Sequence, residues 1–277
     1  MPDVVIRGTR VHYARAGAGP LLLLLHGIGS NSRSFRRQVA ELSDTYTTAA
    51  WDAPGYGRSD DPAEPFGMQD LADDAAALLD HLGAERAHVL GHSLGGVVAQ
   101  LVYHRAPGRV ASLILADTNP GSGSLPEPER SARVRARLQA LETLTPRQIA
   151  EARAPGLVSP DAPPELVAEL IDIMAEIRPV GYRAAAIAMG TSDLRPLVPA
   201  IRVPTLVVCG ERDRVTPPAT AEWLARTIPD ARLVLIPGAG HASQQERPEL
   251  FNAAVREFLQ RLPTQAPLAP TNEPLWT

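Results

Sequence analysis

Short apolar runs alternate with longer segments of helical spacing along most of this 277-residue chain. The run "PLLLLLHG" at 20–27 has no polar residue before its histidine, as expected of a strand that is covered on both faces. Five further runs have a similar character: "TYTTAAWDAPGYG", "RAHVLG", "VASLILADT", "VPTLVVCG" and "ARLVLIPG". Because strands that alternate with helices form mostly parallel sheets with helices on both faces, the sequence predicts an α/β fold.

Helical patterns fill several of the intervals between these strands. The segment "MQDLADDAAALLDHLG" at 68–83 has apolar residues at helical spacing and ends at Gly83, a typical helix stop. Two more helices are expected in "LGGVVAQLVYHRAPG" and "PELFNAAVREFLQRL". The N-terminal "VVIRGTRVHYARAG" predicts a hairpin that turns at Gly8.

The alternation stops after residue 120. Four helical patterns follow with no strand between them, over 127–143, 145–153, 164–177 and 179–190. We interpret this region as an all-helical insertion in the α/β core. The expected organisation is a core of residues 1–120 and 191–262, a helical insertion at 121–190 and an irregular Pro-rich tail at 263–277.

Ser93 stands between a predicted strand and a predicted helix, in "LGHSLGGVVAQ". A helix N-cap would explain the serine but not the glycines on both sides of it. A phosphate-binding turn needs a fuller glycine pattern that this chain does not have. A nucleophile elbow requires this strand–turn–helix context, and its glycines allow the strand and helix to approach closely. We therefore predict that Ser93 is a nucleophile near the positive end of a helix dipole.

A serine nucleophile needs a base, and the base needs an acid that orients it. His241 lies in a glycine-rich loop after the last strand, and Asp213 lies in the loop "GERDRVTPP" after the preceding strand. All three side chains are then expected at carboxyl ends of strands, where open α/β sheets bind ligands. Asp117, at the end of "LILADTNPG", is an alternative acid. His92 is expected to point away from the serine.

The stretch "HGIG" at 26–29 follows the first long strand. It is either a simple tight turn or a loop that turns the backbone N–H of Ile28 toward the serine. Beside a triad we favour the second interpretation, with the N–H of Leu94 as the other donor to an oxyanion.

Composition and charge exclude several classes of function. A net charge of −4 gives no indication of a nucleic-acid partner or an anionic membrane surface. All 27 basic residues are arginine, which rules out lysine Schiff-base chemistry. Cys209 is the single cysteine, so an internal disulfide and a multi-cysteine metal site are excluded, and we expect no metal and no cofactor. With neither a signal-peptide pattern nor a membrane-spanning run, we expect a cytoplasmic monomer or homodimer.

The chain resembles the α/β-hydrolase superfamily over nearly its whole length. The matching landmarks are "HGIG", "DAPGYGRS", "GHSLGG", "GERDRVTP" and "GAGH", in that order. The resemblance implies the α/β-hydrolase fold and makes the helical insertion at 121–190 a cap over the pocket. It also favours Asp213 over Asp117 as the acid, because the "GxxD" loop is the commoner pattern. A serine at position 93 separates the chain from the branches whose nucleophile is aspartate.

Within the serine branch, "HGIGSNSRSF", "WDAPGYG" and the region around "GTSDLRPLVPAIRVPTLVVCGERD" look most similar to 3-oxoadipate enol-lactonases and related esterases. This implies a cofactor-independent hydrolase of a small ester or lactone. The alternatives are an N-acyl-homoserine lactonase, a meta-cleavage C–C bond hydrolase, a perhydrolase, or a ligand-sensing protein with this fold.

Candidate substrate-binding residues come from the loops and from the helical insertion. They are His26, Gly27, Arg33, Leu157, Met174, Ile187 and Val215. Arg130, Arg133 and Arg137 fall on one helical face, which is either a solvated charged surface or an anchor for a substrate carboxylate. Arg33 is a competing anchor.

Overall fold

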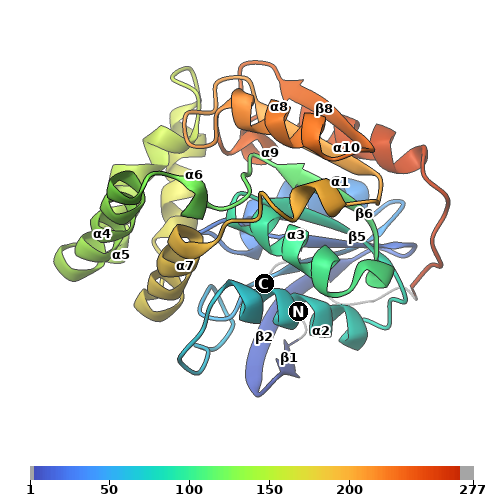
Figure 1. The fold of residues 1–277 in the computed structure, drawn as a ribbon, viewed down its shortest axis with the longest axis horizontal. Helices are drawn as coiled ribbons and strands as arrows, with labels where there is room; N and C mark the ends of the chain where they lie inside the picture. Colours follow the sequence, from blue (N-terminus) through green and yellow to red (C-terminus); the bar gives the residue numbers. More distant parts are fainter. Residues whose placement is uncertain (1–2, 269–277) are drawn as a thin grey trace.

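The computed structural model describes residues 3–268, which are built around one eight-stranded sheet (Figure 1). The strand order is β1-β2-β4-β3-β5-β6-β7-β8. The pairs β1–β2 and β2–β4 are antiparallel, and every other neighbouring pair is parallel, so the predicted α/β architecture is confirmed. The strands are β1 (Asp3–Ile6), β2 (Thr9–Ala16), β3 (Leu21–Leu25), β4 (Thr47–Trp51), β5 (Ala87–His92), β6 (Val110–Ala116), β7 (Thr205–Gly210) and β8 (Ala231–Ile236).

Helices cover both faces of the sheet. On one face lie α2 (Met68–His81), α3 (Leu94–Arg105) and α8 (Pro218–Thr227), and on the other lie α1 (Arg36–Leu42), α9 (Ser243–Glu246) and α10 (Pro248–Gln260). Short 3-10 helices are η1 (Ser32–Phe35), η2 (Pro107–Arg109), η3 (Ser122–Ser124), η4 (Ala154–Leu157) and η5 (Val198–Ala200). Neither α1 nor α8 was predicted from the sequence, because their 7 and 10 residues are too few to define a helical period.

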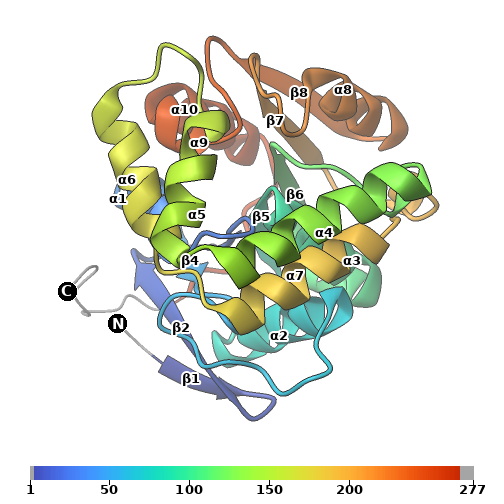
Figure 2. The same cartoon turned by 90° about the vertical axis from the view of Figure 1, so that its left-hand side faces the viewer.

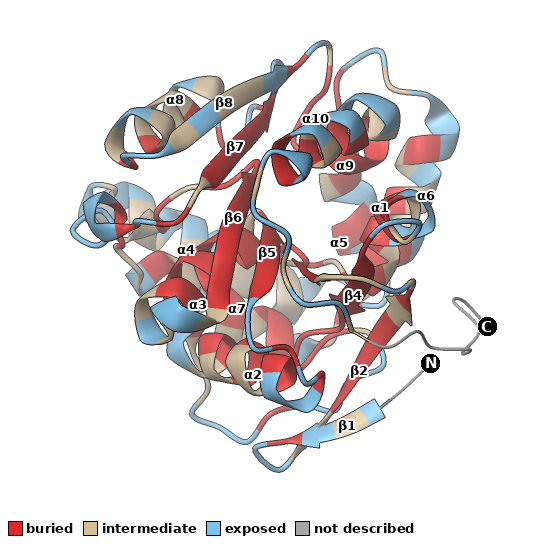
Figure 3. Cartoon of the chain, turned by 90° about the vertical axis from the view of Figure 1, so that its right-hand side faces the viewer, coloured by how far each residue is buried: buried red, intermediate tan, exposed pale blue. Residues whose placement is uncertain are grey.

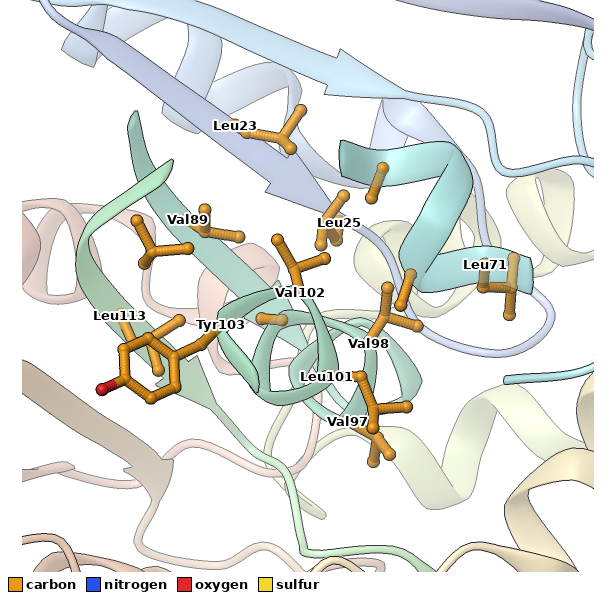
Figure 4. Packing of buried hydrophobic residues seen from close by; sticks show 14 of the residues in the cluster. Leu23, Leu25, Leu71, Val89, Val97, Val98, Leu101, Val102, Tyr103 and Leu113 are labelled. Atoms are coloured by element: carbon orange, nitrogen blue, oxygen red, sulfur yellow. The ribbon is translucent and has the colours of Figure 1, made fainter. Parts of the chain in front are cut away.

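The leucine run of β3 explains why both faces are covered. Successive side chains of a strand point to opposite faces, so Leu23 and Leu25 join the cluster under α2 and α3, whereas Leu22 and Leu24 join the cluster under α1 and α10. Figure 4 shows the first cluster, in which side chains of β3, β5 and β6 meet those of α3. The central strands are buried throughout, while β8 at the edge is partly exposed (Figure 3).

Four further helices lie together on one side of the sheet (Figure 2). They are α4 (Glu127–Thr143), α5 (Pro146–Arg153), α6 (Pro164–Met174) and α7 (Pro179–Thr191). They occupy the four segments in which helical patterns were predicted. α4 packs along α7 and α5 along α6, and a small apolar cluster that includes Ile149, Leu170 and Tyr182 holds the helices together. This cluster is separate from the two that line the sheet.

The C-terminal segment passes back along the N-terminal part of the fold. Residues 263–268 form no helix, and Leu268 pairs with Gly19 through an isolated bridge. The rest of the predicted Pro-rich tail, 269–277, lies outside the described residues. Within the part that is described, no helix is both long enough and apolar enough to cross a bilayer.

Candidate active site

Ser93 occupies the sharp turn between β5 and α3, with φ 53° and ψ −115°. A non-glycine residue in the left-handed region is uncommon and costs backbone energy. Close packing on both sides maintains the turn. A Cβ atom on Gly91 would lie 2.1 Å from the carbonyl oxygen of Gly95, and one on Gly95 would lie 2.0 Å from that of Leu25. The two glycines are thus required because strand and helix backbones touch here.

The loops after β7 and β8 bring two more predicted residues to this turn. His241 Nε2 lies 3.1 Å from Ser93 Oγ. On its other side, His241 Nδ1 lies 2.8 Å from Asp213 Oδ2. The three side chains form one hydrogen-bonded chain, although Ser93 and His241 are 148 residues apart along the sequence.

The hydrogen bonds around Asp213 stabilise its charged form. Val215 N–H and Thr216 N–H donate to Asp213 Oδ1 at 2.7 and 2.9 Å, and the Thr216 hydroxyl donates to Oδ2 at 2.6 Å. Burial alone would raise the pKa of Asp213, but the bonds from His241 and Thr216 and the charge of His241 outweigh it. The pKa of this carboxyl therefore lies below its ordinary value, and Asp213 is an anion at neutral pH.

Asp117, the alternative acid, is close by but does not face the imidazole of His241. Its Oδ1 accepts from Gly210 N–H at 2.7 Å, and its Oδ2 accepts from the hydroxyl of Ser243 at 2.5 Å. Burial, and next the negative charge of Asp213, raise the pKa of Asp117 well above its ordinary value. Asp117 thus ties the end of β7 to the start of α9, while Asp213 contacts the imidazole.

Two backbone N–H groups beside Ser93 have no acceptor among the described residues, those of Ile28 and Leu94. Leu94 is the first residue of α3, where an N–H has no partner inside the helix. The Ile28 loop lies against the turn, since a Cβ on Gly27 would be 3.1 Å from Ser93 Cβ. Two free donors beside a serine match the arrangement that stabilises an oxyanion.

Two other histidines position these loops. His92 Nε2 donates to the carbonyl oxygen of His241 at 2.8 Å, and burial, then the charge of His241, lowers the pKa of His92 to about 3. His92 lines the cavity at Ser93, so the expectation that it points away is wrong. His26 Nδ1 donates to Gly27 O at 2.8 Å, and its Nε2 accepts from Ala53 N–H at 3.0 Å.

A cavity of about 40 Å³ lies over Ser93 and His241. Four of the seven predicted substrate-binding residues line it, as does Ile28; these four are Gly27, Leu157, Met174 and Val215.

The other three lie elsewhere, each for a physical reason. His26 is buried beneath the loop, where both ring nitrogens bond to backbone groups. The guanidinium of Arg33 pairs with Glu176 at 2.5 Å, outside the cavity. Ile187 is 45% exposed on the outer side of α7. These three residues therefore do not line the cavity over Ser93, and their contact with a substrate stays a prediction.

Arg137, Arg153 and Gln245 also line the cavity, and of these only Arg137 was considered as a substrate anchor in the sequence analysis. Arg137 is the only one of the three α4 arginines considered there that reaches it, and it is joined by Arg153 of α5. Gln245 follows His241 by four residues and is only 4% exposed. Helical spacing gave no signal for Arg153, because its role depends on how α5 packs rather than on its own pattern.

The carboxylates of Asp117 and Asp213 and the thiol of Cys209 lie within 4.8 Å of one another. Metal binding there would need a thiolate, whereas burial, then the nearby carboxylates, raise the pKa of Cys209 far above its ordinary value. Both carboxylates already accept hydrogen bonds on both oxygens. The donor set therefore does not suit a metal ion.

A mostly parallel sheet whose strand ends bring Ser, His and Asp together after an elbow defines the architectural class of the α/β hydrolases. Comparison with known families agrees. The sequence profile described as the Alpha/beta hydrolase family matches residues 22–254. The chain belongs to this family.

Several characterised proteins are similar over nearly the whole chain. 3-Oxoadipate enol-lactonase 2 of Acinetobacter baylyi is 32% identical, covering 91% of this chain and 93% of its own. 2-(Acetamidomethylene)succinate hydrolase of Mesorhizobium japonicum is 34% identical, covering 88% and 89%. A malate-bound esterase of Thermogutta terrifontis superimposes with a TM-score of 0.87 at 31% identity, covering 94% of this chain and 98% of its own.

Proposed function

We propose that this protein is a cofactor-independent serine hydrolase that cleaves a carboxylic ester or lactone. The observation that carries the proposal is the hydrogen-bonded chain Ser93–His241–Asp213, with distances of 3.1 and 2.8 Å, beside two unpaired N–H groups. The relatives named as an enol-lactonase and as an esterase support the same class of reaction.

In the first half-reaction, Ser93 Oγ attacks the substrate carbonyl carbon and its proton passes to His241 Nε2. Asp213 holds the imidazole in the required orientation and stabilises the charge that it gains. The N–H groups of Ile28 and Leu94 donate to the oxyanion of the tetrahedral intermediate. The intermediate collapses, the C–O bond breaks, and His241 returns the proton to the leaving oxygen. An ester releases an alcohol here, whereas a lactone keeps its new hydroxyl attached to the acyl group.

In the second half-reaction, water attacks the acyl-enzyme and gives its proton to His241 Nε2. The second tetrahedral intermediate is stabilised by the same two N–H groups and collapses to a carboxylic acid. His241 then returns the proton to Ser93 Oγ. The sum is one ester bond and one water converted to one acid and one hydroxyl group, with no other reactant.

We also propose that residues 121–190 act as a cap. Leu157 and Met174 from this segment line the cavity together with Gly27 and Val215 from the core. A cavity of about 40 Å³ has room for only a few water molecules, so a substrate must displace side chains or helices of the cap to bind there. Such a cap favours small lactones and short-chain esters over long-chain triglycerides.

The experiment is a hydrolysis screen of activated esters and lactones with wild-type protein and Ser93→Ala. The variant should lose on the order of 10⁶ in kcat, because triad members act as a unit. A fluorophosphonate should label wild type at Ser93, as mapped by mass spectrometry, and should label Ser43→Ala equally well, since Ser43 stands at the end of α1 and does not line the cavity. Labelling at another serine, with Ser93→Ala still active, would overturn the mechanism. Tight ligand binding without turnover would instead indicate a sensor.

A further inference from the structure

A groove of about 380 Å³ runs over the helical segment beside the cavity at Ser93. Helices α4 and α5 form its walls, Tyr182 of α7 contributes to it, and the loop after β7 closes one side. Its lining residues are Arg133, Ala136, Arg137, Ala140, Leu144, Ile149, Ala152, Arg153, Tyr182, Arg214 and Val215.

The charges along this groove have one sign. Four of its lining residues are arginines, and none of those described is acidic. Arg133 pairs with Glu129 at 2.8 Å. Arg137, Arg153 and Arg214 form no ion pair within the described residues, although most other arginines of the chain do. Three uncompensated guanidinium groups thus converge on one groove.

The groove and the cavity share a wall. Arg137, Arg153 and Val215 line both of them. Val215 follows the acid Asp213 by two residues, so this wall is continuous with the triad loop. The groove therefore adjoins the cavity over Ser93 at these three residues.

Two buried hydrogen-bond donors that line the cavity at Ser93 lack partners. Arg153 Nε is buried with no acceptor among the described residues, and so is Gln245 Nε2, on a side chain that is 4% exposed. A buried donor left unpaired costs free energy. Burial, and next the charge of Arg153, lower the pKa of Arg137, which indicates that the two guanidinium groups repel each other in a poorly solvated place. An anion placed between them would pair these donors and offset the repulsion.

We propose that the groove is the substrate's route to Ser93 and that Arg137 and Arg153, with the amide of Gln245, bind a carboxylate carried by the substrate. A carboxylate fits because a guanidinium offers it two parallel hydrogen bonds. Since these arginines line the same small cavity as Ser93, the carboxylate is joined to the ester or lactone by a short chain. This inference rests on the proposed function for its catalytic readout.

The kinetic test compares two activated esters of similar size, 4-nitrophenyl hydrogen succinate and the neutral 4-nitrophenyl pentanoate. Wild type should favour the succinate in kcat/KM by about ten- to hundredfold, the range expected for charged hydrogen bonds. Arg137→Gln and Arg153→Gln should each lose about tenfold or more on the succinate and change the pentanoate by less than about threefold. Arg130→Gln is the matched control, because Arg130 belongs to α4 but lines neither the groove nor the cavity. This variant should leave kcat/KM unchanged for both esters.

The dependence of kcat/KM on ionic strength is a second measurement, and a purely structural role of the arginines would not affect it. Raising the ionic strength from about 0.01 M to about 1 M shortens the Debye length from about 30 to about 3 Å. It should lower kcat/KM for the succinate and leave the pentanoate nearly unchanged, and Arg214→Gln should weaken this salt dependence. Equal turnover of both esters by wild type, or equal losses on both in the arginine variants, would overturn the carboxylate subsite.

A binding arm separates this inference from the proposed function. Calorimetric titration of Ser93→Ala with succinate measures the subsite without turnover. Binding that Arg153→Gln abolishes supports the subsite even if no ester is hydrolysed by wild type. Rapid hydrolysis of the pentanoate without succinate binding rejects the subsite while the proposed function stands. Binding of inorganic phosphate to Ser93→Ala without binding of succinate would also reject a carboxylate subsite.

Discussion

At the residue scale, the chemistry depends on which of two buried carboxylates faces His241. Asp213 and Asp117 both follow a strand of the sheet and lie near each other. Their hydrogen bonds separate them: Asp213 contacts the imidazole at 2.8 Å, whereas Asp117 contacts Gly210 and Ser243. The pKa of Asp213 is lowered and that of Asp117 is raised, so Asp213 carries the negative charge that the imidazolium needs.

We therefore expect Asp213→Asn to lower kcat by about 10⁴, because an amide would leave His241 wrongly oriented and its charge unsupported. Asp117→Asn should cost less than about tenfold, since an amide can still accept from Gly210 N–H and bond to Ser243. Steady-state kinetics on one activated ester would measure both. The opposite ranking of the two variants would move the acid to Asp117.

At the element scale, the site depends on contact between the start of α3 and the end of β3. The N–H of Leu94 belongs to the first turn of α3, and the Ile28 loop continues from β3. Because Gly95 lies directly against the backbone of Leu25, this contact fixes the two donors relative to each other. Backbone atoms cannot rotate away as a flexible side chain can, so a larger residue here must move the helix.

Gly95→Ala tests that contact. Alanine would favour the helix by about 1 kcal/mol, but its Cβ would meet Leu25 O at 2.0 Å, and overpacking typically costs about 1–3 kcal/mol. The clash should win, lowering Tm by several degrees and reducing kcat because the Leu94 N–H moves. Thermal unfolding and kinetics would be measured beside Gly108→Ala, whose Cβ meets nothing within 4 Å. Similar behaviour of the two variants would contradict this account of the elbow.

At the scale of the whole molecule, buried histidines link stability to pH. His88 of β5 is 2% exposed, and its Nδ1 lies 2.8 Å from Ser112 Oγ. Burial, and next the charge of Arg86, lower the pKa of His88 to about 4. The unfolded chain, with an ordinary histidine pKa of about 6.5, takes up this proton first as the pH falls. The contribution of neutral His88 is therefore complete above about pH 6.5 and is lost progressively toward pH 4.

His88→Gln isolates this effect from the carboxylates, which titrate alike in both proteins. The substitution should destabilise at pH 7 by removing a buried side chain that fits its site. Its cost should shrink by about 2 kcal/mol at pH 5, since each pH unit below 6.5 costs the wild type about 1.4 kcal/mol. Urea unfolding at both pH values would measure the difference. A cost that does not depend on pH would show that His88 titrates normally in the folded protein.

The sequence could predict the features that local pattern controls. Alternating runs gave the α/β sheet and the four helices of residues 127–191, and glycines on both sides of Ser93 gave the turn that the structure describes. The loops of Asp213 and His241 were assigned because residues at carboxyl ends of parallel strands share one edge of the sheet. Short α1 and α8 were not predicted, since too few residues repeat to define a period.

Only the tertiary structure decided which side chains share the cavity. Arg130 and Arg137 are about two helical turns apart on the same predicted face of α4, yet only Arg137 lines the cavity. Ile187 was predicted to line the pocket but is exposed. Arg153 and Gln245 were not predicted from the sequence, yet both line the cavity. The physical reason is range: periodicity and turn chemistry act over a few neighbouring residues, whereas the face that a helix presents to a cavity is set by the distant elements against which it packs.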